Sequence, residues 1–412
     1  MAEATPAPAV ILGGSYNSLS VARALGRQGI PVHALGDGAG GSLVRNSRYL
    51  ASYTDVSSSA AASGEWLAWL RSGPSGAVVL PCSDGALQFL AEHRAELRAL
   101  GLFPAAGADE VTLAMLDKEQ TYALARSVGV PAPRTAAVST LEELRAVAAT
   151  MDYPCALKPR HSHLFARAFD SKLLVADDAE ALEAAFLATA EHDLEMIVTE
   201  IIPGDDSRYC SYYSYIDDDG TPLFHFTKRK PRQNPPGFGL GTYHVTDWVP
   251  DAAELGLRFF TGAGLRGIGN VEFKRDSRDG QLKIIECNPR FTAADKLVQR
   301  AGVDMATLAY RRALGLPVDP PSTFRRGVRQ WHPVEDVQAF RAYRAAGQLS
   351  TASWLASIAR PVLLPMLDWR DPRPSVVYAG SFARRVLRFA RRRLTPSARA
   401  GSPRPEVPSQ VR

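Results

Sequence analysis

Two carboxylates and an amide fall on one side of a predicted β-hairpin between Asn270 and Arg290. The arms alternate apolar and polar residues, as half-buried strands do. If residues 278–280 form a three-residue loop with the glycine left-handed, Glu272 lies directly opposite Glu286, and Asn288 shares their face. Mg²⁺ prefers such oxygen ligands, so the hairpin predicts a metal site; the alternative is a solvated strand face with acids there by chance.

The opposite face of this hairpin is predicted to be apolar. In the same register Val271, Phe273, Ile285 and Cys287 point away from the carboxylates and would pack into a core. The hairpin is therefore expected to form one wall of a binding site, with core residues behind it.

A single lysine, Lys158, ends the strand-like segment 153–159. An ammonium group at the end of a buried strand needs a partner, and an anionic phosphate suits its compact charge. The alternative is an ordinary surface lysine at a strand end.

The composition indicates a globular chain with two or three domains. Of the 412 residues, 46% are hydrophobic and 22% are charged. We find no transmembrane stretch and no secretory signal, so a cytoplasmic protein is expected. The cysteines are scattered and form no Cys-x-x-Cys pair, which argues against zinc and against a disulfide framework. They are Cys82, Cys155, Cys210 and Cys287.

The formal charge of +5 is unevenly distributed. From Pro321 onward, 17 Arg, no Lys and five acidic residues give a net charge of +12, which leaves about −7 for residues 1–320. A mildly acidic body argues against nucleic-acid binding, whose basic patch would lie on the folded domain.

The first 100 residues alternate strand-like and helix-like segments around glycine turns. This order predicts a doubly wound parallel sheet, but a complete dinucleotide-binding fingerprint is missing after the first strand. Because ligands gather at strand ends in such sheets, residues 13–17 and 81–85 are candidates to touch a substrate, or are plain turns.

Five motifs follow one another in a fixed order: Asp-Lys118 before a helix, Tyr-Pro-x-x-Leu-Lys158-Pro, Thr-Glu200-Ile-Ile-Pro-Gly-Asp-Asp, Glu272, and Glu286-x-Asn288-x-Arg290. Over residues 10–316 this order resembles the ATP-grasp superfamily. Within it the chain is similar to carboxylate-amine ligases of the D-aspartate ligase and D-alanine:D-alanine ligase kind, and to carbamoyl-phosphate-synthase-like proteins.

The resemblance implies an α/β ATP-grasp fold. It implies a Rossmann-like pre-ATP-grasp domain over residues 1–112 and an ATP-grasp domain over 113–320, the latter with subdomains 113–198 and 199–320. Residues 321–394 are expected to form a helical C-terminal extension with a disordered basic tail over 395–412.

The resemblance also implies roles for single residues. Lys118 and Lys158 correspond to the lysines that hold the nucleotide phosphates, and Arg290 to the arginine that steadies the transferring phosphoryl group. The adenine linker corresponds to Thr199, Glu200 and Ile202, and the ribose-binding acid corresponds to Asp206. The ligands of Mg²⁺ correspond to Glu272, Glu286 and Asn288. Two ions are expected, with Mn²⁺ as a substitute.

Two loops are expected near the phosphates. Residues 227–241 combine cations with Pro and Gly, which predicts either a mobile lid, with Lys230 as a third phosphate-binding lysine, or a solvated surface loop. The segment 159–167 lacks the glycines that many relatives have. Its side chains could donate hydrogen bonds instead, or it could be a surface loop; they are Arg160, His161, Ser162 and His163.

Near the C-terminus, residues 381–394 place apolar side chains at helical spacing against a ring of Arg. This pattern predicts a basic amphipathic helix, and it fits packing on the protein body, peripheral contact with anionic membrane, or contact with an anionic partner.

These features together favour one activity. We expect an ATP-dependent ligase that joins a small-molecule carboxylate to an amine through an acyl phosphate, and releases ADP and phosphate. The alternative is a non-catalytic ATP-binding module with a basic C-terminal arm. The identities of the carboxylate and the amine are not readable from the sequence.

Overall fold

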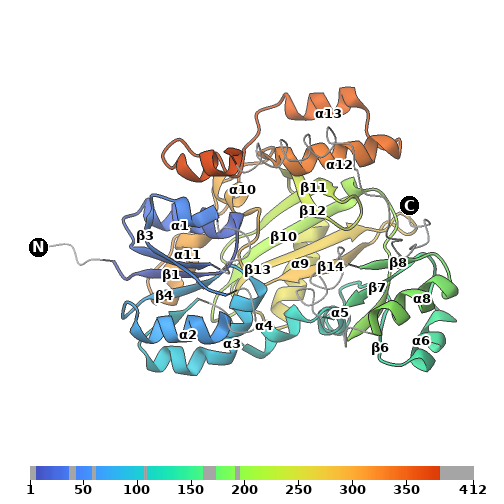
Figure 1. Ribbon diagram of the computed structural model, residues 1–412, viewed down its shortest axis with the longest axis horizontal. Helices are drawn as coiled ribbons and strands as arrows, with labels where there is room; N and C mark the ends of the chain where they lie inside the picture. The colour runs from blue at the N-terminus through green and yellow to red at the C-terminus, as the bar shows by residue number, and fades with distance from the viewer. Residues whose placement is uncertain are drawn as a thin grey trace, which may run out of the picture.

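The computed structural model describes residues 6–36, 43–57, 62–105, 107, 109–160, 173–190 and 195–380. The described chain forms three sheets, with an additional helical layer from the C-terminal part (Figure 1). The sequence predictions for His161, Ser162, His163, the 381–394 helix and the 395–412 tail lie outside the described residues.

The first sheet is parallel, as predicted, with the order β3-β2-β1-β4-β5. The order reverses between β1 and β4, so the loops after these two strands lie at the switch point where such sheets bind ligands. Its strands are β1 (Ala9–Leu12), β2 (Val32–Gly36), β3 (Leu50–Asp55), β4 (Val78–Pro81) and β5 (Phe103–Pro104). Its helices are α1 (Tyr16–Gly26), η1 (Leu43–Asn46), α2 (Ala62–Ser72) and α3 (Asp84–Ala99).

The second sheet is antiparallel, with the order β6-β9-β7-β8, and two helices pack on it. Its strands are β6 (Thr135–Val138), β7 (Cys155–Pro159), β8 (Leu174–Ala176) and β9 (Met196–Glu200). The helices are α6 (Leu141–Ala148) and α8 (Ala179–Ala190), and α4 (Asp109–Leu116) and α5 (Lys118–Ser127) connect this layer to the first sheet.

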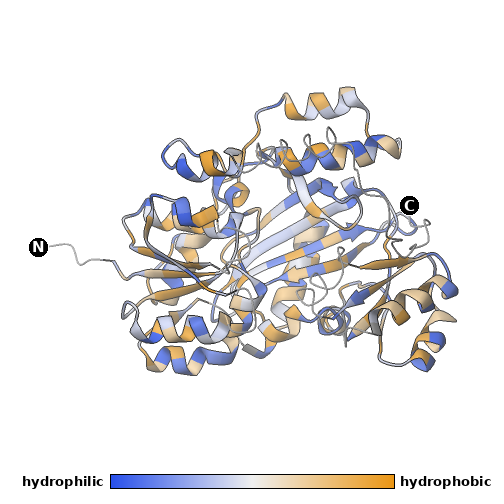
Figure 2. Cartoon of the chain, in the orientation of Figure 1, coloured by the Kyte–Doolittle hydropathy of each residue, from blue (hydrophilic) through white to orange (hydrophobic). Residues whose placement is uncertain are grey.

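The third sheet is antiparallel, with the order β14-β13-β10-β11-β12-β15. Its strands are β10 (Tyr209–Ile216), β11 (Phe226–Asn234), β12 (Leu240–Thr246), β13 (Gly267–Arg275), β14 (Leu282–Asn288) and β15 (Arg329–Trp331), and η2 (Asp206–Arg208) precedes them. Helix α9 (Pro250–Gly262) packs on the apolar face through Phe259 and Phe260. In Figure 2 strand β11 is largely hydrophilic, whereas β1 and β4 are hydrophobic.

The predicted lid over residues 227–241 is wrong. Most of this segment forms β11 and the start of β12, and β11 pairs with both β10 and β12. Two of its cations, Lys228 and Lys230, are two residues apart and share one face of the sheet, toward Ser211 and Glu272. Pro231 lies where the β11–β12 pairing is irregular, which is how an inner strand accommodates proline.

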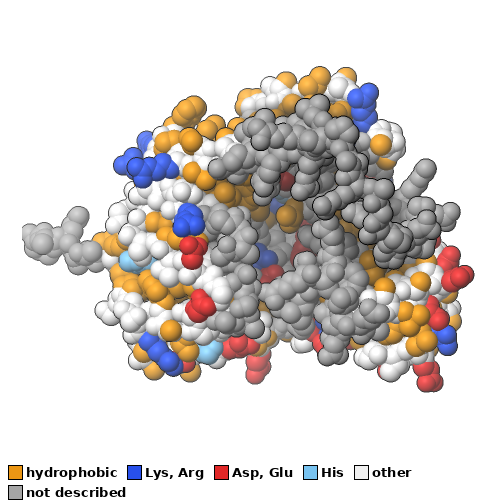
Figure 3. Space-filling view, viewed as in Figure 1, with side chains coloured by type: hydrophobic (Ala, Val, Ile, Leu, Met, Phe, Trp, Pro, Cys, Tyr) orange, Lys and Arg blue, Asp and Glu red, His pale blue; other side chains and the backbone are white. Residues whose placement is uncertain are grey.

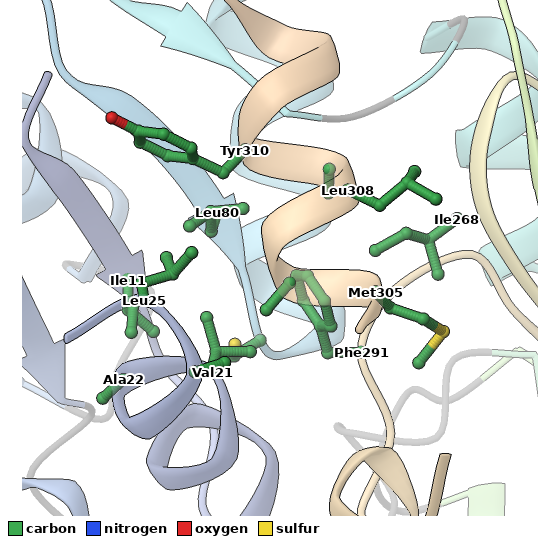
Figure 4. Close-up of a cluster of buried hydrophobic side chains, with 14 of the residues drawn as sticks. Ile11, Val21, Ala22, Leu25, Leu80, Ile268, Phe291, Met305, Leu308 and Tyr310 are labelled. Atoms are coloured by element: carbon green, nitrogen blue, oxygen red, sulfur yellow. The ribbon is translucent and has the colours of Figure 1, made fainter. Parts of the chain in front are cut away.

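The first and third sheets share one hydrophobic core. Helix α11 (Met305–Ala313) packs between them, beside α10 (Asp295–Arg300). Figure 4 shows Ile11 and Leu80 of the parallel sheet in the same cluster as Ile268 and Phe291. This contact fixes the loops of the first sheet relative to the β13–β14 hairpin.

The C-terminal part packs on the protein body and contributes more than helices. Strand β15 extends the third sheet, and it is followed by α12 (Pro333–Ala345) and α13 (Thr351–Ile358). Buried ion pairs attach this extension at two places: Arg232 bonds Asp336, and Arg23 bonds Asp371. No helix of the described residues is long and apolar enough to cross a bilayer. In Figure 3 charged side chains of both signs are scattered over the described surface that faces the viewer.

Candidate active site

The predicted pairing of the two candidate metal-ligand carboxylates is confirmed. Glu272 on β13 lies directly opposite Glu286 on β14, and Asn288 lies opposite Asn270. The three candidate ligands Glu272, Glu286 and Asn288 therefore share one face of the hairpin.

The route to this pairing differs from the prediction in two respects. The loop has four residues, 277–280, because the Asp276 amide donates to the Gln281 carbonyl (2.9 Å). A β-bulge between positions 272 and 273 then restores the register, and the extra residue is Ile285 on β14.

The prediction that Ile285 packs in the core is therefore wrong. Ile284 takes the core position, while Ile285 joins Glu286 in lining a cleft. The buried Tyr122 hydroxyl donates to the Ile285 carbonyl (2.9 Å), which satisfies a backbone group that the bulge leaves outside the ladder. Val271, Phe273 and Cys287 are buried, as predicted.

This cleft lies where four elements of the structure meet. It is lined by residues of α3, α4, α5 and β14, including Asp84, Lys118, Tyr122, Glu286 and Asn288. Asp84 comes from the 81–85 loop, so one of the two predicted substrate loops lies at the site. The other loop, 13–17, lies against it, because the Asn17 amide donates to the Cys82 and Phe291 carbonyls (2.6 and 3.0 Å).

Arg290 is held between the two halves of the site. Its Nε donates to Asp84 Oδ1 (2.5 Å) and its second terminal nitrogen to Asn288 Oδ1 (3.0 Å). The guanidinium plane is thus fixed beside the metal-ligand face. Asp84 is a residue whose individual role the sequence did not reveal.

The two lysines expected at the phosphates lie beside Glu286. Lys118 begins α5, and Lys158 lies near the end of β7. Burial, with the neighbouring Lys118 ammonium, lowers the pKa of Lys158 to about 8, and the Glu286 carboxylate opposes this shift. Two ammonium groups held close together form a ready site for a polyanion.

The start of α5 is attached to the end of β7 by an ion pair. Asp117 caps the helix by accepting from the Glu119 amide (2.8 Å), and Arg160 Nε and one terminal nitrogen donate to Asp117 Oδ2 (3.1 and 2.6 Å). Arg160 therefore braces the elements that carry the two lysines.

Lys230, the predicted third lysine, reaches the same face from β11. Its Nζ lies 2.7 Å from Glu272 Oε1 and 4.1 Å from the Tyr209 ring centroid. Lys228, two residues earlier, donates to Ser211 Oγ (3.1 Å) and lies 3.4 Å from His244 Nδ1. Burial lowers the pKa of Lys228 to about 8, although the Glu272 carboxylate opposes the shift.

The expected adenine linker begins with the last two residues of β9. Ile202 is buried, and the Thr199 hydroxyl bonds Thr135 (3.0 Å). Glu200 accepts from the Arg134 amide (3.1 Å) and pairs with Arg278. The side chains of Thr199 and Glu200 thus connect β9 to β6 and to the β13–β14 hairpin.

Asp206, the expected ribose ligand, has protein partners in this structure. It accepts from Gln233 Nε2 (2.9 Å), the Gly237 amide (2.8 Å) and the Tyr343 hydroxyl. These bonds connect η2 to the β11–β12 hairpin and α12, and the ribose role stays a prediction.

The donor set on the hairpin fits a hard divalent cation. Like charges directly opposite on neighbouring strands repel, and only Glu272 of the pair has an ion-pair partner among the described residues. Over the same residues, no group of three or more His, Cys, Asp or Glu could hold a metal. Two carboxylates and an amide leave room for phosphate oxygens, as Mg²⁺ sites at nucleotides do.

Among curated proteins the chain resembles two ligases. It is 25% identical over 243 residues to a D-aspartate ligase from Enterococcus faecium, covering 56% of each chain. It is 28% identical over 247 residues to a D-alanine–D-alanine ligase from Xanthomonas axonopodis pv. citri, covering 55% of this chain and 72% of that one. The chain thus spans little more than half the length of the D-aspartate ligase.

Solved structures with a similar fold include two further enzymes. The biotin carboxylase domain of Hydrogenobacter thermophilus 2-oxoglutarate carboxylase has a TM-score of 0.61 at 17% identity, covering 78% of this chain and 73% of that one. The Staphylococcus aureus N5-carboxyaminoimidazole synthetase complexed with ADP has a TM-score of 0.61 at 15% identity, covering 78% and 80%.

No protein-family profile matches the chain. The similar proteins named above are all ATP-grasp enzymes. In the order of its motifs and in its three-sheet fold, the chain resembles enzymes of the ATP-grasp superfamily.

Proposed function

We propose that this protein is an ATP-dependent ligase that forms an amide bond between a small-molecule carboxylate and an amine. The observation that carries the proposal is the facing pair Glu272 and Glu286, with Lys118 and Lys158 beside it. This arrangement would neutralise a nucleotide polyphosphate and would hold a metal that stabilises the charge of phosphoryl transfer. The curated relatives are named as ligases of the same class.

The reaction needs no side-chain nucleophile. The substrate carboxylate attacks the γ-phosphorus of ATP, the bond to ADP breaks, and an acyl phosphate forms; the neutral amine then displaces phosphate. Lys118 and Lys158 hold the transferring phosphates, and Arg290 stabilises charge on the acyl phosphate. Asp84 fixes the orientation of Arg290 through the 2.5 Å hydrogen bond.

Mg²⁺, when bound, would be held by Glu272, Glu286 and Asn288 and would supply electrostatic stabilisation of the developing phosphate charge. Binding of the metal requires Lys230 to share Glu272 or to move to a phosphate oxygen, since its Nζ lies 2.7 Å from Glu272 Oε1. That exchange would couple metal and nucleotide binding to the position of Lys230. We propose that two Mg²⁺ ions bind.

The test is a screen for substrate-dependent ADP release. The full chain is incubated with MgATP and pairs drawn from amino acids and small acids, and ADP, phosphate and amide are measured. Hydroxylamine in place of the amine traps an acyl phosphate as a hydroxamate. Release of ADP by a pair, with hydroxamate formed from its carboxylate, supports the proposal, and the Glu286→Gln variant is the inactive control.

A different result would point to the non-catalytic alternative. MgATP binding with no ADP release across the whole panel would contradict the ligase proposal. An intact set of metal ligands argues against that outcome, because a module kept for binding alone has no need of both carboxylates and Asn288.

The basic segment 381–394 carries a separate proposal from the sequence alone. Its Arg residues could hold the protein at anionic lipid, since each basic residue contributes about 1 kcal/mol near such a surface. Co-sedimentation with anionic vesicles, compared between the full chain and a chain ending at Ala379, tests it. Loss of binding with salt and with truncation is expected; no binding by the full chain would contradict it.

A further inference from the structure

Two neighbouring carboxylates at the start of α12 have opposite surroundings. Asp336 is fully buried and is saturated with hydrogen bonds from Arg232, Thr242, Trp331 and Trp354. Glu335 Oε1 lies 3.4 Å from the hydroxyls of Tyr16 and Tyr378, and its Oε2 is buried with no hydrogen-bond partner. Among the described residues no cation forms an ion pair with Glu335.

A second buried acceptor without a partner lies on β15, five residues earlier in the chain. Gln330 is fully buried, and its Nε2 lies 3.3 Å from the Ala293 carbonyl and 3.1 Å from His332 Nε2. The carbonyl of Ala293 can only accept, which sets the amide nitrogen on that side. Gln330 Oε1 has no hydrogen-bond partner.

The two unpartnered acceptors belong to one polar cluster, which we define as Tyr16, Gln330, His332, Glu335 and Tyr378. The Tyr16 ring stands edge-on to the His332 ring, with 5.1 Å between centroids, and its hydroxyl lies 3.2 Å from that of Tyr378. The cluster therefore combines the N-terminal domain, the third sheet and the C-terminal extension.

A row of polar contacts links this cluster to the metal-ligand face. The His332 ring lies 6.2 Å from the His244 ring, and His244 Nδ1 lies 3.4 Å from Lys228 Nζ. Lys228 bonds Ser211, which stands directly opposite Glu272 in the sheet. The cluster thus lies at the far end of the same polar sheet face as the candidate metal ligands.

The chemistry of the unpartnered atoms selects a class of ligand. Both atoms can only accept hydrogen bonds, and one carries negative charge, so leaving them dry and unpaired is costly. A protonated primary amine supplies three donors and a positive charge. An anion or a neutral carbonyl compound supplies neither.

We propose that this cluster binds an ammonium group of the substrate other than the amine that reacts, with Glu335 Oε2 and Gln330 Oε1 as its acceptors. The identification of the ligand as a substrate rests on the proposed ligase function, whereas the ammonium site itself does not. The C-terminal extension, through Gln330, Glu335 and Tyr378, then serves as a recognition element of the enzyme.

Thermal shift with ethanolamine, which is protonated at neutral pH, tests the ammonium site in the full chain. Ethylene glycol, a neutral molecule of the same size, and matched NaCl are the controls. We expect ethanolamine alone to raise the melting temperature of the wild type, as a ligand of the folded state does. Glu335→Gln keeps the volume but removes the charge, so the apparent affinity should fall at least about tenfold.

Further variants make the test specific. Gln330→Met removes the second acceptor and should weaken ethanolamine binding, whereas Glu142→Gln, at an exposed carboxylate of α6, should leave it unchanged. Equal stabilisation by ethanolamine and ethylene glycol in the wild type, or an unchanged ethanolamine shift in both Glu335→Gln and Gln330→Met, would overturn the proposal.

Titration with ADP separates this proposal from the ligase proposal. Normal ADP binding by Glu335→Gln, with ethanolamine binding lost, supports a separate ammonium site. If the wild type binds ethanolamine but neither binds nor turns over nucleotide, the ligase proposal fails while the ammonium site stands.

Discussion

Glu272 and Glu286 face each other across β13 and β14 beside a bulged residue, Ile285. On the turn side of the bulge Phe273 pairs with Ile284, and beyond it Glu272 pairs with Glu286. Ile285 and Glu286 are consecutive, yet both line the cleft. The bulge therefore gives the site an apolar wall next to a candidate metal ligand, without moving Cys287 out of the core.

Replacing one of the facing carboxylates should stop catalysis without unfolding the protein. Glu286→Gln removes a charge at constant volume, so we expect turnover to fall at least ~10²-fold, the usual loss for an electrostatic clamp. The melting temperature should not fall, because the change also relieves repulsion from Glu272. Steady-state kinetics and calorimetry check both; near-normal activity would exclude Glu286 as a metal ligand.

The hydroxyl of Tyr122 should act on the metal site through the bulge. Tyr122→Phe leaves the Ile285 carbonyl without its donor, which should cost about 1 kcal/mol of folding free energy. Because the bulge positions Glu286, the Mg²⁺ concentration needed for half-maximal activity should also rise. Tyr153→Phe, whose hydroxyl bonds the Ala148 carbonyl away from the hairpin, is the matched control. A stability loss with an unchanged Mg²⁺ requirement would make Tyr122 purely structural.

Nucleotide binding should depend on pH through Lys158. With its pKa near 8, Lys158 is charged at pH 7 and loses its charge above pH 8, so ATP affinity should weaken over that interval. Lys158→Arg keeps its charge and should flatten the dependence. Titrations with ATP between pH 7 and 9 measure the effect, and a flat wild-type profile would contradict it.

A rise in pH should increase folding stability through Lys158, although the same rise weakens ATP binding. The folded pKa of Lys158, about 8, lies below its ordinary value of 10.5, so between these pH values the unfolded chain binds more protons and wild-type stability rises with pH. Lys158→Ala should therefore weaken ATP binding strongly at pH 7 while lowering the melting temperature of the ligand-free protein little or not at all. A large drop in melting temperature with ATP affinity unchanged would mark Lys158 as structural.

The metal hairpin was predictable because its evidence is local. Period-two alternation decides which residues share a face, and one glycine turn brings the two arms together. The bulge at Ile285 was not predictable, since it depends on a donor, Tyr122, that lies far away in sequence. The predicted loop was one residue too short, and the prediction lacked the one extra residue of the bulge. These two errors cancel, so the predicted pairing of Glu272 with Glu286 is correct.

Strand β11 shows where reasoning from residue type fails. The segment 227–241, which holds Lys228, Lys230 and Arg232, is predicted to be a loop because its cations stand next to Pro and Gly. Each of these cations has a partner supplied by another element: Ser211, Glu272 and Asp336. The period-two spacing of Lys228 and Lys230 was the available signal for a strand. The irregularity at Pro231, which turns Arg232 to the other face, was not readable from that spacing.

The C-terminal extension should depend on one buried ion pair for its attachment to the N-terminal domain. Asp371, fully buried, accepts from Arg23 Nε (2.9 Å), the Ser47 hydroxyl (2.8 Å) and the Arg48 amide (2.9 Å). Asp371→Ala leaves Arg23 buried and unpaired, which should cost ~3–5 kcal/mol of unfolding free energy. Glu96→Gln, which breaks the exposed pair with Arg71, is the control and should change stability little.

Asp371→Ala should also change the structure of the ammonium cluster. Tyr378 lies seven residues after Asp371 and approaches Glu335 only while the extension stays attached. Hydrogen exchange over residues 366–380 should therefore quicken in Asp371→Ala at temperatures where the rest of the protein remains folded, and ethanolamine binding should weaken in parallel. If unfolding free energy and exchange both match the wild type, the Arg23–Asp371 pair does not hold the extension in place.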